Sequence, residues 1–215
     1  TYAAHGATVW LLGRTEAKLE AVYDEIEAAG GAQPAILPAD LSTLTEQQCD
    51  TLAATLADNI GHLDGLLHNA SILGERRPIE SAGYEPWCEV MQVNVNAQFL
   101  LTRSLLPLLT AAPTASILFT SSGVGRQGRA YWGAYAVSKF ATEGFMQILA
   151  DELENTTQVR VNSLNPGATN TAMRRSAYPA ETPTDNLSPD AIMPAYLYLM
   201  GDDSQGVTGQ AFNAQ

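Results

Sequence analysis

The chain alternates short apolar runs of β-type residues with longer segments that have the periodicity of amphipathic helices. Such alternation is what βαβ crossovers require, and it is typical of a parallel sheet covered by helices. The strands are predicted at residues 8–12, 35–38, 63–68, 116–120, 159–164 and 210–214, and the helices at residues 16–29, 46–60, 85–111, 135–154 and 190–200. The pattern therefore predicts an α/β fold built on a doubly wound parallel sheet.

Local signals mark several helix ends. Thr15 and Ser188 precede helical segments and are the expected N-caps, because a hydroxyl can accept from the free N–H groups of a first turn. Gly30 with Gly31 is expected to end the first helix, and Pro107 is expected to bend or end the helix that contains it. With 215 residues and no internal repeat, the chain is expected to form one domain over its whole length.

The charge balance narrows the classes of partner. Lys and Arg number 11 against 23 Asp and Glu, for a formal net charge of -12, and no basic block stands out. Nucleic acid and anionic membrane surfaces are therefore not expected as partners. No apolar run approaches the roughly 18 residues of a membrane helix, and the first residues lack the charged and apolar regions of a signal peptide. We expect a soluble, cytoplasmic protein.

Metal-ligating residue types are few. Cys49 and Cys88 form no C-x2-C spacing, and His5, His62 and His68 are scattered along the chain. Two reduced thiols of a cytosolic protein are the expected state of the cysteines. We expect no metal site.

Candidate chemistry concentrates in residues 122–139. Ser122 and Tyr135 have twelve residues between them (S-x12-Y), and Lys139 follows Tyr135 at the i+4 position (Y-x3-K). If this segment is helical, Tyr135 and Lys139 share one face. A phenol has a pKa of about 10, and a neighbouring ammonium is expected to lower that pKa toward the range in which the phenol exchanges protons. Ser122 follows a predicted strand, at the edge of the sheet where α/β proteins bind ligands.

Each of these residues alone also fits a structural role. A half-buried Tyr beside a Lys that extends to solvent is common on helices, and Ser at a strand end often caps a turn. In combination the three residues resemble the short-chain dehydrogenase/reductase family, whose catalytic pattern is this Ser, Tyr and Lys. The resemblance implies hydride transfer between a nicotinamide and a carbonyl or secondary alcohol. It makes Tyr135 the general acid and base, Lys139 the residue that lowers the pKa of Tyr135 and binds the nicotinamide ribose, and Ser122 the donor to the substrate oxygen.

Asn94 interrupts the apolar face of the helix predicted at residues 85–111. Burying an amide without partners costs roughly 1 to 3 kcal/mol, so Asn94 is expected to have a polar task. The resemblance gives it a catalytic one, in which Asn94 kinks the helix and its carbonyl binds a water that leads to Lys139. Asn96 is the second candidate for this role.

Two strand ends carry candidate residues for the adenosine half of the cofactor. Gly13 and Arg14 end the first predicted strand, and Asp40 with Leu41 follows the second. Taken alone, Arg14 is equally an exposed residue at a strand end, and Asp40 fits a helix cap. With the resemblance, Gly13 leaves room for a 2'-phosphate and Arg14 binds it in a bidentate fork, which favours NADP, although NAD remains possible. Asp40 would accept from the adenine amino group.

The segment His68-Asn69-Ala70-Ser71 follows the third predicted strand and resembles the family's N-N-A-G. His68 and Ser71 depart from that pattern, whereas Asn69 and Ala70 match it. The resemblance implies that the matching pair holds the central strand and lines the adenine ribose.

Residues 165–171 follow another strand and match the family's P-G-x-x-x-T. Pro166 and Gly167 turn the chain and allow close approach of the backbone to a ring. Thr169 and Thr171 can bond the carboxamide and phosphates of the cofactor. A Pro-Gly pair after a strand is usually only a turn, but at this position it is expected to fix the nicotinamide. Residues 173–187 are expected to form a mobile lid over the substrate.

The resemblance covers essentially the whole chain and is closest to one bacterial branch. The chain lacks the family's first strand and its Gly-rich loop T-G-x3-G-x-G. In the family's strand order the missing strand lies between the strands at residues 9–12 and 63–68. A central parallel strand is buried on both faces, so its loss removes stabilisation comparable with that of a whole domain. We therefore expect the chain to be an N-terminally truncated domain. By itself it is expected to fold poorly and to bind NADPH weakly.

The function expected from the sequence is NADPH-dependent reduction of a small-molecule carbonyl compound. Two alternatives are a non-catalytic nucleotide-binding or regulatory protein on the same fold, and an epimerase or dehydratase, which keeps Tyr-x3-Lys. Apolar side chains on two helices, at Phe99, Leu105, Phe145 and Leu149, cover more of the helix surface than one sheet face would bury. A homodimer or homotetramer is therefore expected.

Overall fold

The computed structural model describes residues 1–215, which form two compact units, residues 1–44 and 45–215. The six strands form two separate parallel sheets, β1-β2 in the first unit and β3-β4-β5-β6 in the second. Strands and helices alternate along the chain, so the predicted α/β class with parallel sheets is confirmed. That the chain is a single domain stays a prediction.

In the first unit one helix connects two parallel strands. β1 (Trp10–Gly13) pairs with β2 (Ala35–Pro38) in parallel, and α1 (Glu16–Ala28) joins them. Thr15 is confirmed as the N-cap residue of α1, although its side chain makes no capping hydrogen bond. Gly30 ends the helix with a positive φ of 76°, a conformation that favours glycine.

In the second unit a four-stranded sheet carries the core. It contains β3 (Gly65–His68), β4 (Ala115–Thr120), β5 (Val159–Asn165) and β6 (Ala211–Asn213), each parallel to its neighbour. All six residues of β4 are buried. The near-continuous apolar run of this strand suits burial on both faces.

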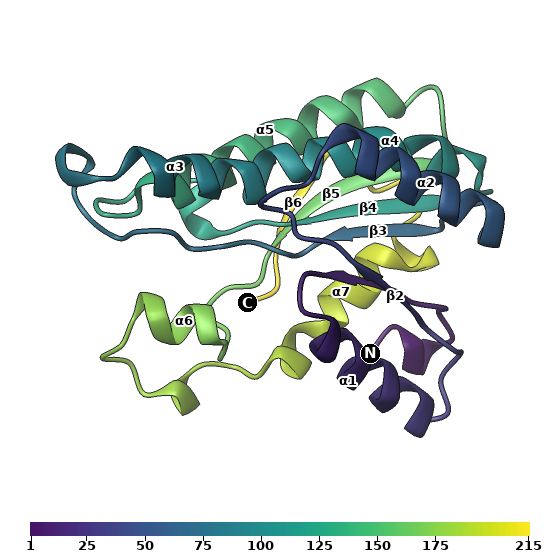
Figure 1. Ribbon diagram of the computed structural model, residues 1–215, viewed down its shortest axis with the longest axis horizontal. Helices are drawn as coiled ribbons and strands as arrows, with labels where there is room; N and C mark the ends of the chain where they lie inside the picture. Colours follow the sequence, from purple (N-terminus) through teal and green to yellow (C-terminus); the bar gives the residue numbers. More distant parts are fainter. The chain divides into compact units, whose positions relative to one another are not determined.

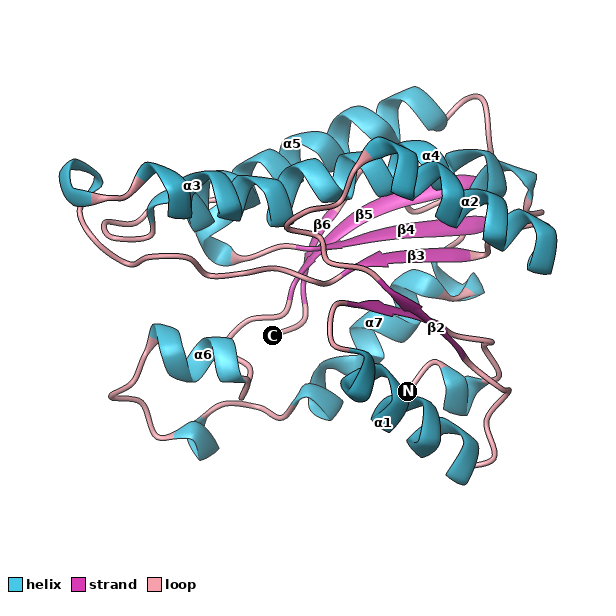
Figure 2. Cartoon of the chain, in the orientation of Figure 1, coloured by secondary structure: helices cyan, strands magenta, loops and turns pink.

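Helices cover both faces of this sheet (Figures 1 and 2). On one face α4 (Ala97–Ala111) and α5 (Gly133–Leu153) pack, with α2 (Glu46–Ile60) and α3 (Tyr84–Met91) beside them. α7 (Met193–Met200) lies on the opposite face, where the Ser116 hydroxyl of β4 donates to the carbonyl of Leu199 at 2.7 Å. No helix is both long and apolar enough to span a membrane.

The helix predicted at residues 85–111 is not one regular helix. It consists of α3, a π-helical turn at Gln92–Asn96, and α4. π-bulges of this kind often lie at functional sites. Pro107 does not end the helix, because α4 continues to Ala111.

The remaining short elements include α6 (Ala172–Ala177), which the sequence did not predict. Ser188 is confirmed as an N-cap, since its hydroxyl accepts from the N–H of Ala191 in the turn Pro189–Ile192 that precedes α7. Other 3-10 turns lie at Ala3–His5, Ile79–Ser81, Gly123–Gly125, Pro183–Asp185 and Asp202–Ser204.

Candidate active site

The fold brings Ser122, Tyr135 and Lys139 together beyond the carboxyl end of β4. Ser122 follows the strand in extended conformation, and its side chain interacts with the phenol of Tyr135. Tyr135 and Lys139 lie on the buried face of α5, with 7% and 1% of their surfaces exposed. The Lys139 Nζ lies 5.7 Å from the centre of the Tyr135 ring and donates to the carbonyl of Thr120 at 2.7 Å.

The electrostatics of this trio differ from the expectation. Burial raises the pKa of Tyr135 above its ordinary value, and the hydrogen bond from Ser122 opposes this only in part. The prediction that Lys139 lowers the pKa of Tyr135 is therefore wrong for this arrangement, in which the ammonium is directed at Thr120. Burial also lowers the pKa of Lys139 to about 8, although the nearby carboxylate of Glu143 raises it.

Asn94 is fully buried inside the π-helical turn and has the polar task expected of it. Its Oδ1 accepts from the N–H of Ile72 at 2.8 Å, and its Nδ2 donates to the Ile72 carbonyl at 2.9 Å and to the Ser138 hydroxyl at 3.0 Å. Asn94 thus ties the chain after β3 to α5, one residue before Lys139. The alternative, Asn96, is exposed and only bonds Gln92 on its own turn. The water relay assigned to Asn94 stays a prediction.

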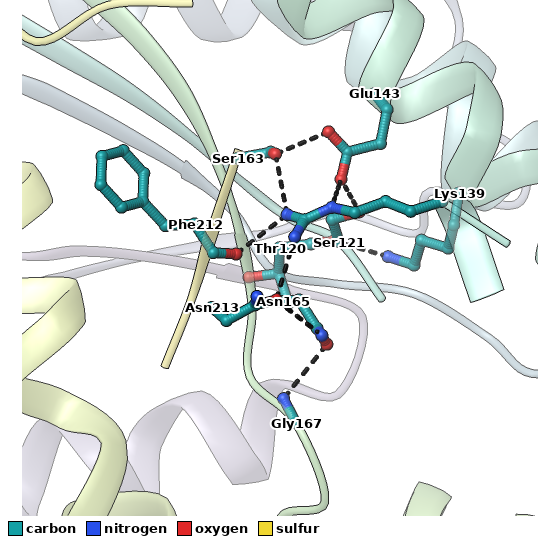
Figure 3. A network of polar contacts seen from close by, with 10 residues as sticks. Thr120, Ser121, Lys139, Glu143, Ser163, Asn165, Gly167, Phe212 and Asn213 are labelled. Carbon is teal, nitrogen blue, oxygen red and sulfur yellow. Dashed lines mark hydrogen bonds and ion pairs between the residues drawn. The ribbon is translucent and has the colours of Figure 1, made fainter. Parts of the chain in front are cut away.

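A buried ionic network that the sequence analysis did not identify lies close to Lys139 (Figure 3). Glu143 follows Lys139 by one helical turn and is only 6% exposed. Its carboxylate accepts from the hydroxyls of Ser121 at 2.5 Å and Ser163 at 2.7 Å, and from Nε of Arg126 at 2.8 Å. In the sequence, Glu143 lies four positions after Lys139 and therefore on the same helix face. Because a carboxylate on a buried face requires a partner, this spacing could have indicated the network.

The same network reaches the turn after β5. Arg126 donates to Oδ1 of Asn213 and to the carbonyl of Phe212, both at 2.9 Å. The Asn213 Oδ1 also accepts from Asn165 at 3.1 Å, and Asn165 in turn accepts from the N–H of Gly167 at 3.1 Å. Continuous hydrogen bonds therefore connect α5, the loop after β4, β6 and the predicted nicotinamide turn (Figure 3).

The turn at Pro166 and Gly167 has the close-approach geometry expected of it. Gly167 has a φ of 73°, and a Cβ there would lie 2.8 Å from the side chain of Gln215, so only glycine fits without displacement. The Thr169 hydroxyl donates to the Pro166 carbonyl at 3.2 Å. The Thr171 hydroxyl accepts from the N–H of Arg174 at 3.1 Å, caps α6, and keeps its own proton free to donate.

Asn69 and Ala70 lie directly after β3, as predicted, and the Oδ1 of Asn69 accepts from the Thr120 hydroxyl at 3.0 Å. His68, a departure from the family pattern, is buried against Phe119 with ring centres 4.8 Å apart. Its Nε2 lies 2.8 Å from the Thr102 hydroxyl, and burial lowers its pKa to about 3. His68 is therefore a neutral core residue near physiological pH.

The remaining predicted cofactor residues lie in the first unit. Arg14 and Asp40 follow the neighbouring parallel strands β1 and β2, and Leu41 follows Asp40. The Asp40 carboxylate accepts from the hydroxyl of Ser42 at 2.7 Å and from its N–H at 2.9 Å. These bonds lower the pKa of Asp40, and the charge of Arg14 adds to the effect. Asp40 is not a helix cap, because Thr45 forms the capping box of α2.

A cavity of about 440 Å³ opens at this site. The hydroxyls of Ser122 and Tyr135 line it together with two groups of residues. One group is the predicted cofactor residues Asn69, Asn165, Pro166, Gly167, Thr169 and Thr171, and the other is Leu73, Trp132, Met173, Arg174, Ala177 and Tyr178. Except for Arg174, the second group packs in one hydrophobic cluster with Tyr135. Residues 173–187, the predicted lid, thus contribute to the lining, while their mobility stays a prediction. A lining of polar and apolar groups fits a nicotinamide beside an organic substrate.

Comparison with known proteins identifies the family. The family model described as short chain dehydrogenase matches residues 1–182. The oxidoreductase YciK of Escherichia coli K12 is 55% identical over 215 residues, which cover 100% of this chain and 84% of YciK. The NADPH-dependent pterin aldehyde reductase of Arabidopsis thaliana is 29% identical, with 82% of this chain and 70% of the reductase covered.

Solved structures agree with this result. A short chain dehydrogenase from Pseudomonas syringae is 62% identical and superposes with a TM-score of 0.98, covering 100% of this chain and 87% of that one. One from Escherichia coli CFT073, complexed with NADPH, is 55% identical with a TM-score of 0.97, covering 100% of this chain and 89% of that one. The family and the bacterial branch that the motifs indicated are both confirmed. The chain belongs to the short-chain dehydrogenase/reductase family of oxidoreductases.

Proposed function

We propose that this protein reduces a carbonyl compound to an alcohol with NADPH. The observation that carries the proposal is that the Ser122 and Tyr135 side chains interact and line one cavity, with Lys139 beside Tyr135, and that this cavity is large enough for a nicotinamide and a small substrate. Two solved structures similar to this chain, from Shigella flexneri and Escherichia coli CFT073, are complexes with NADP and NADPH. The free thiols of Cys49 and Cys88 support a cytoplasmic location.

Cofactor-binding roles are proposed for residues of each unit, taken separately. Pro166, Gly167, Thr169 and Thr171 would hold the nicotinamide, and Lys139 its ribose. Asn69 and Ala70 would line the adenine ribose. In the first unit, Arg14 would bind the 2'-phosphate, and Asp40 with Leu41 the adenine. When bound, NADPH supplies the hydride that the carbonyl carbon takes up.

The chain's own residues handle the carbonyl oxygen. Ser122 donates a hydrogen bond to it, and Tyr135 transfers its phenolic proton to the developing alkoxide. Because burial raises the pKa of Tyr135, the phenol carries its proton at neutral pH, as a general acid requires. Lys139 provides positive charge beside the phenolate that this proton transfer leaves. In the oxidative direction Tyr135 would act as the base.

The direct test is a screen of carbonyl compounds for NADPH consumption by the full-length protein. Turnover of at least one aldehyde or ketone, with the alcohol as product, is expected. If no carbonyl compound consumes NADPH and no alcohol reduces NADP, the proposal fails. No feature of the site favours the non-catalytic or the epimerase/dehydratase alternative.

Cofactor preference can be tested at Arg14. Replacing Arg14 by Ala is expected to weaken NADPH binding by about 10- to 100-fold, the range for a charge-assisted hydrogen bond, and to change NADH binding little. Calorimetric titration of both cofactors measures this. Lys18→Ala removes the same charge from the exposed part of α1 and is the control. Tighter binding of NADH than NADPH by the wild type would contradict the assignment.

The predicted oligomer rests in part on other residues than the sequence suggested. Leu105 and Leu149 are buried within the unit, at 3% and 5% exposed, and Phe145 is half-buried. On α4 and α5, the exposed large apolar side chains are Phe99, which the sequence suggested, and a stripe of Val137, Phe140 and Ile148 along α5, all between 43% and 59% exposed. A symmetric dimer or tetramer that pairs these faces stays our proposal.

Light scattering of the full-length protein at micromolar concentration is expected to give a dimer or tetramer. Ile148→Glu places a charge in the stripe and is expected to shift the mass toward the monomer. Gln147→Glu, on the adjacent exposed position of α5, is the matched control. A wild-type monomer would refute the assembly.

A further inference from the structure

The guanidinium of Arg76, which does not itself line the cavity, lies over two aromatic rings that do. The rings of Trp132 and Tyr178, both cavity-lining residues, have centres 5.8 Å apart. The guanidinium carbon of Arg76 lies 4.5 Å from the centre of the Trp132 ring and 5.2 Å from that of Tyr178. Trp132 also contacts the catalytic Tyr135, with ring centres 5.8 Å apart. One indole therefore separates the guanidinium from the phenol that protonates the carbonyl oxygen.

Arg76 has no acidic partner, unlike Arg77 and Arg174. Arg77 pairs with Glu75 at 2.9 Å, and Arg174 forms two bonds to Glu181 at 2.7 and 2.5 Å. Arg76 is exposed, and its guanidinium interacts with the two aromatic rings.

A guanidinium that stacks face-on against an aromatic ring keeps its N–H donors at its edge, in a fork that matches a carboxylate. Arg174 cannot serve in this way, because Glu181 already occupies its fork. No acidic side chain occupies the donors of Arg76, which lies against two of the rings that line the cavity.

The rest of the wall is apolar. Leu73, Met173 and Ala177 complete the surface between the Ser122–Tyr135 pair and the two rings. A cavity of about 440 Å³ that must also admit a nicotinamide leaves room for a compact organic body. Flat rings suit such a wall because aromatic contacts stabilise them.

We propose that the substrate is a compact, ring-containing carbonyl compound that carries a carboxylate, and that Arg76 binds this carboxylate while Ser122 and Tyr135 bind the carbonyl oxygen. The inference rests on the proposed reductase function of the same site. It assigns Trp132 and Tyr178 a double role, as the surface for the ring and as the platform that orients Arg76.

The test compares 4-carboxybenzaldehyde with 4-methylbenzaldehyde, which have similar shape and differ in charge. The wild-type full-length protein is expected to show a lower KM for the carboxylated aldehyde. Arg76→Gln is expected to raise that KM by about 10- to 100-fold, the range for a charge-assisted bond, and to lose at least tenfold more kcat/KM on the carboxylated than on the methylated aldehyde. Arg77→Gln removes the same charge one residue away and is expected to leave the ratio of the two substrates unchanged.

A binding measurement separates this inference from the proposed function. Calorimetric titration of the NADP complex with 4-carboxybenzyl alcohol needs no turnover, and Arg76→Gln is expected to weaken that binding. Arg76-dependent binding without any carbonyl reduction would sink the function and leave the carboxylate site standing. Equal losses on both aldehydes, or no preference for the carboxylated compounds in the wild type, would show that Arg76 only packs against the rings and would overturn the inference.

Discussion

Replacing Tyr135 by Phe is expected to lower kcat for carbonyl reduction by about 10² to 10⁴-fold, the usual contribution of general acid catalysis. The substitution removes only the hydroxyl, so the ring keeps its contact with Trp132 and the hydrophobic cluster around it. Cofactor affinity and the melting temperature should therefore change little. Steady-state rates, NADPH titration and thermal unfolding of the same preparation measure the three quantities.

Tyr131 provides the matched control. It lies four residues before Tyr135, is 58% exposed, and is not among the residues that line the cavity. Tyr131→Phe removes the same hydroxyl and should leave kcat close to that of the wild type. If Tyr135→Phe retains turnover within a factor of two, Tyr135 is not the acid.

The sequence predicts the elements whose pattern is local. The helix at residues 46–60 has the predicted bounds, and each predicted strand overlaps an observed one. The run Ala115–Thr120 is mostly apolar, and the structure buries it. The helix predicted at residues 85–111 fails at Asn94, whose amide bonds the backbone of Ile72 on another segment. No periodicity within the helix encodes that partner. α6 escaped prediction because its six residues are too few to show a helical period.

The difference between local patterns and contacts that only the fold creates also applies to the site. Ser122, Tyr135 and Lys139 could be predicted because two elements adjacent in the chain carry all three. The pKa of Tyr135 could not, since it depends on how far the phenol is buried. Arg126 and Glu143 are 17 positions apart in sequence, and only the fold shows that they meet.

Outside the catalytic trio, we expect the largest effect from a substitution of Glu143, first of all on the free energy of unfolding. Its carboxylate neutralises Arg126, whose side chain is 26% exposed, while that of Glu143 is 8% exposed. Removing one partner of a buried pair typically costs 3 to 5 kcal/mol. Because Arg126 reaches solvent in part, we expect Glu143→Gln to lower the free energy of unfolding by about 3 kcal/mol, at the low end of that range. Denaturant unfolding measures the change.

The same substitution should shift the pH dependence of activity. The pKa of Lys139, about 8, reflects burial, which lowers it, and the charge of Glu143, which raises it. The other groups around Lys139 do not titrate near that pH, because burial keeps the pKa of His68 at about 3 and raises that of Tyr135. If catalysis requires the ammonium, wild-type activity is complete below the pKa of Lys139 and declines as pH rises through it.

Without the carboxylate of Glu143 the pKa of Lys139 falls further, so the alkaline decline of kcat is expected to begin at lower pH in Glu143→Gln than in the wild type. If Glu143 had only a structural role, Glu143→Gln would lower the free energy of unfolding and leave the pH of the alkaline decline of kcat unchanged. Glu152→Gln makes the same charge change on the exposed face of α5 and should alter neither quantity. Matching alkaline limbs for Glu143→Gln and the wild type, measured where both are folded, would show that Glu143 does not set the charge of Lys139.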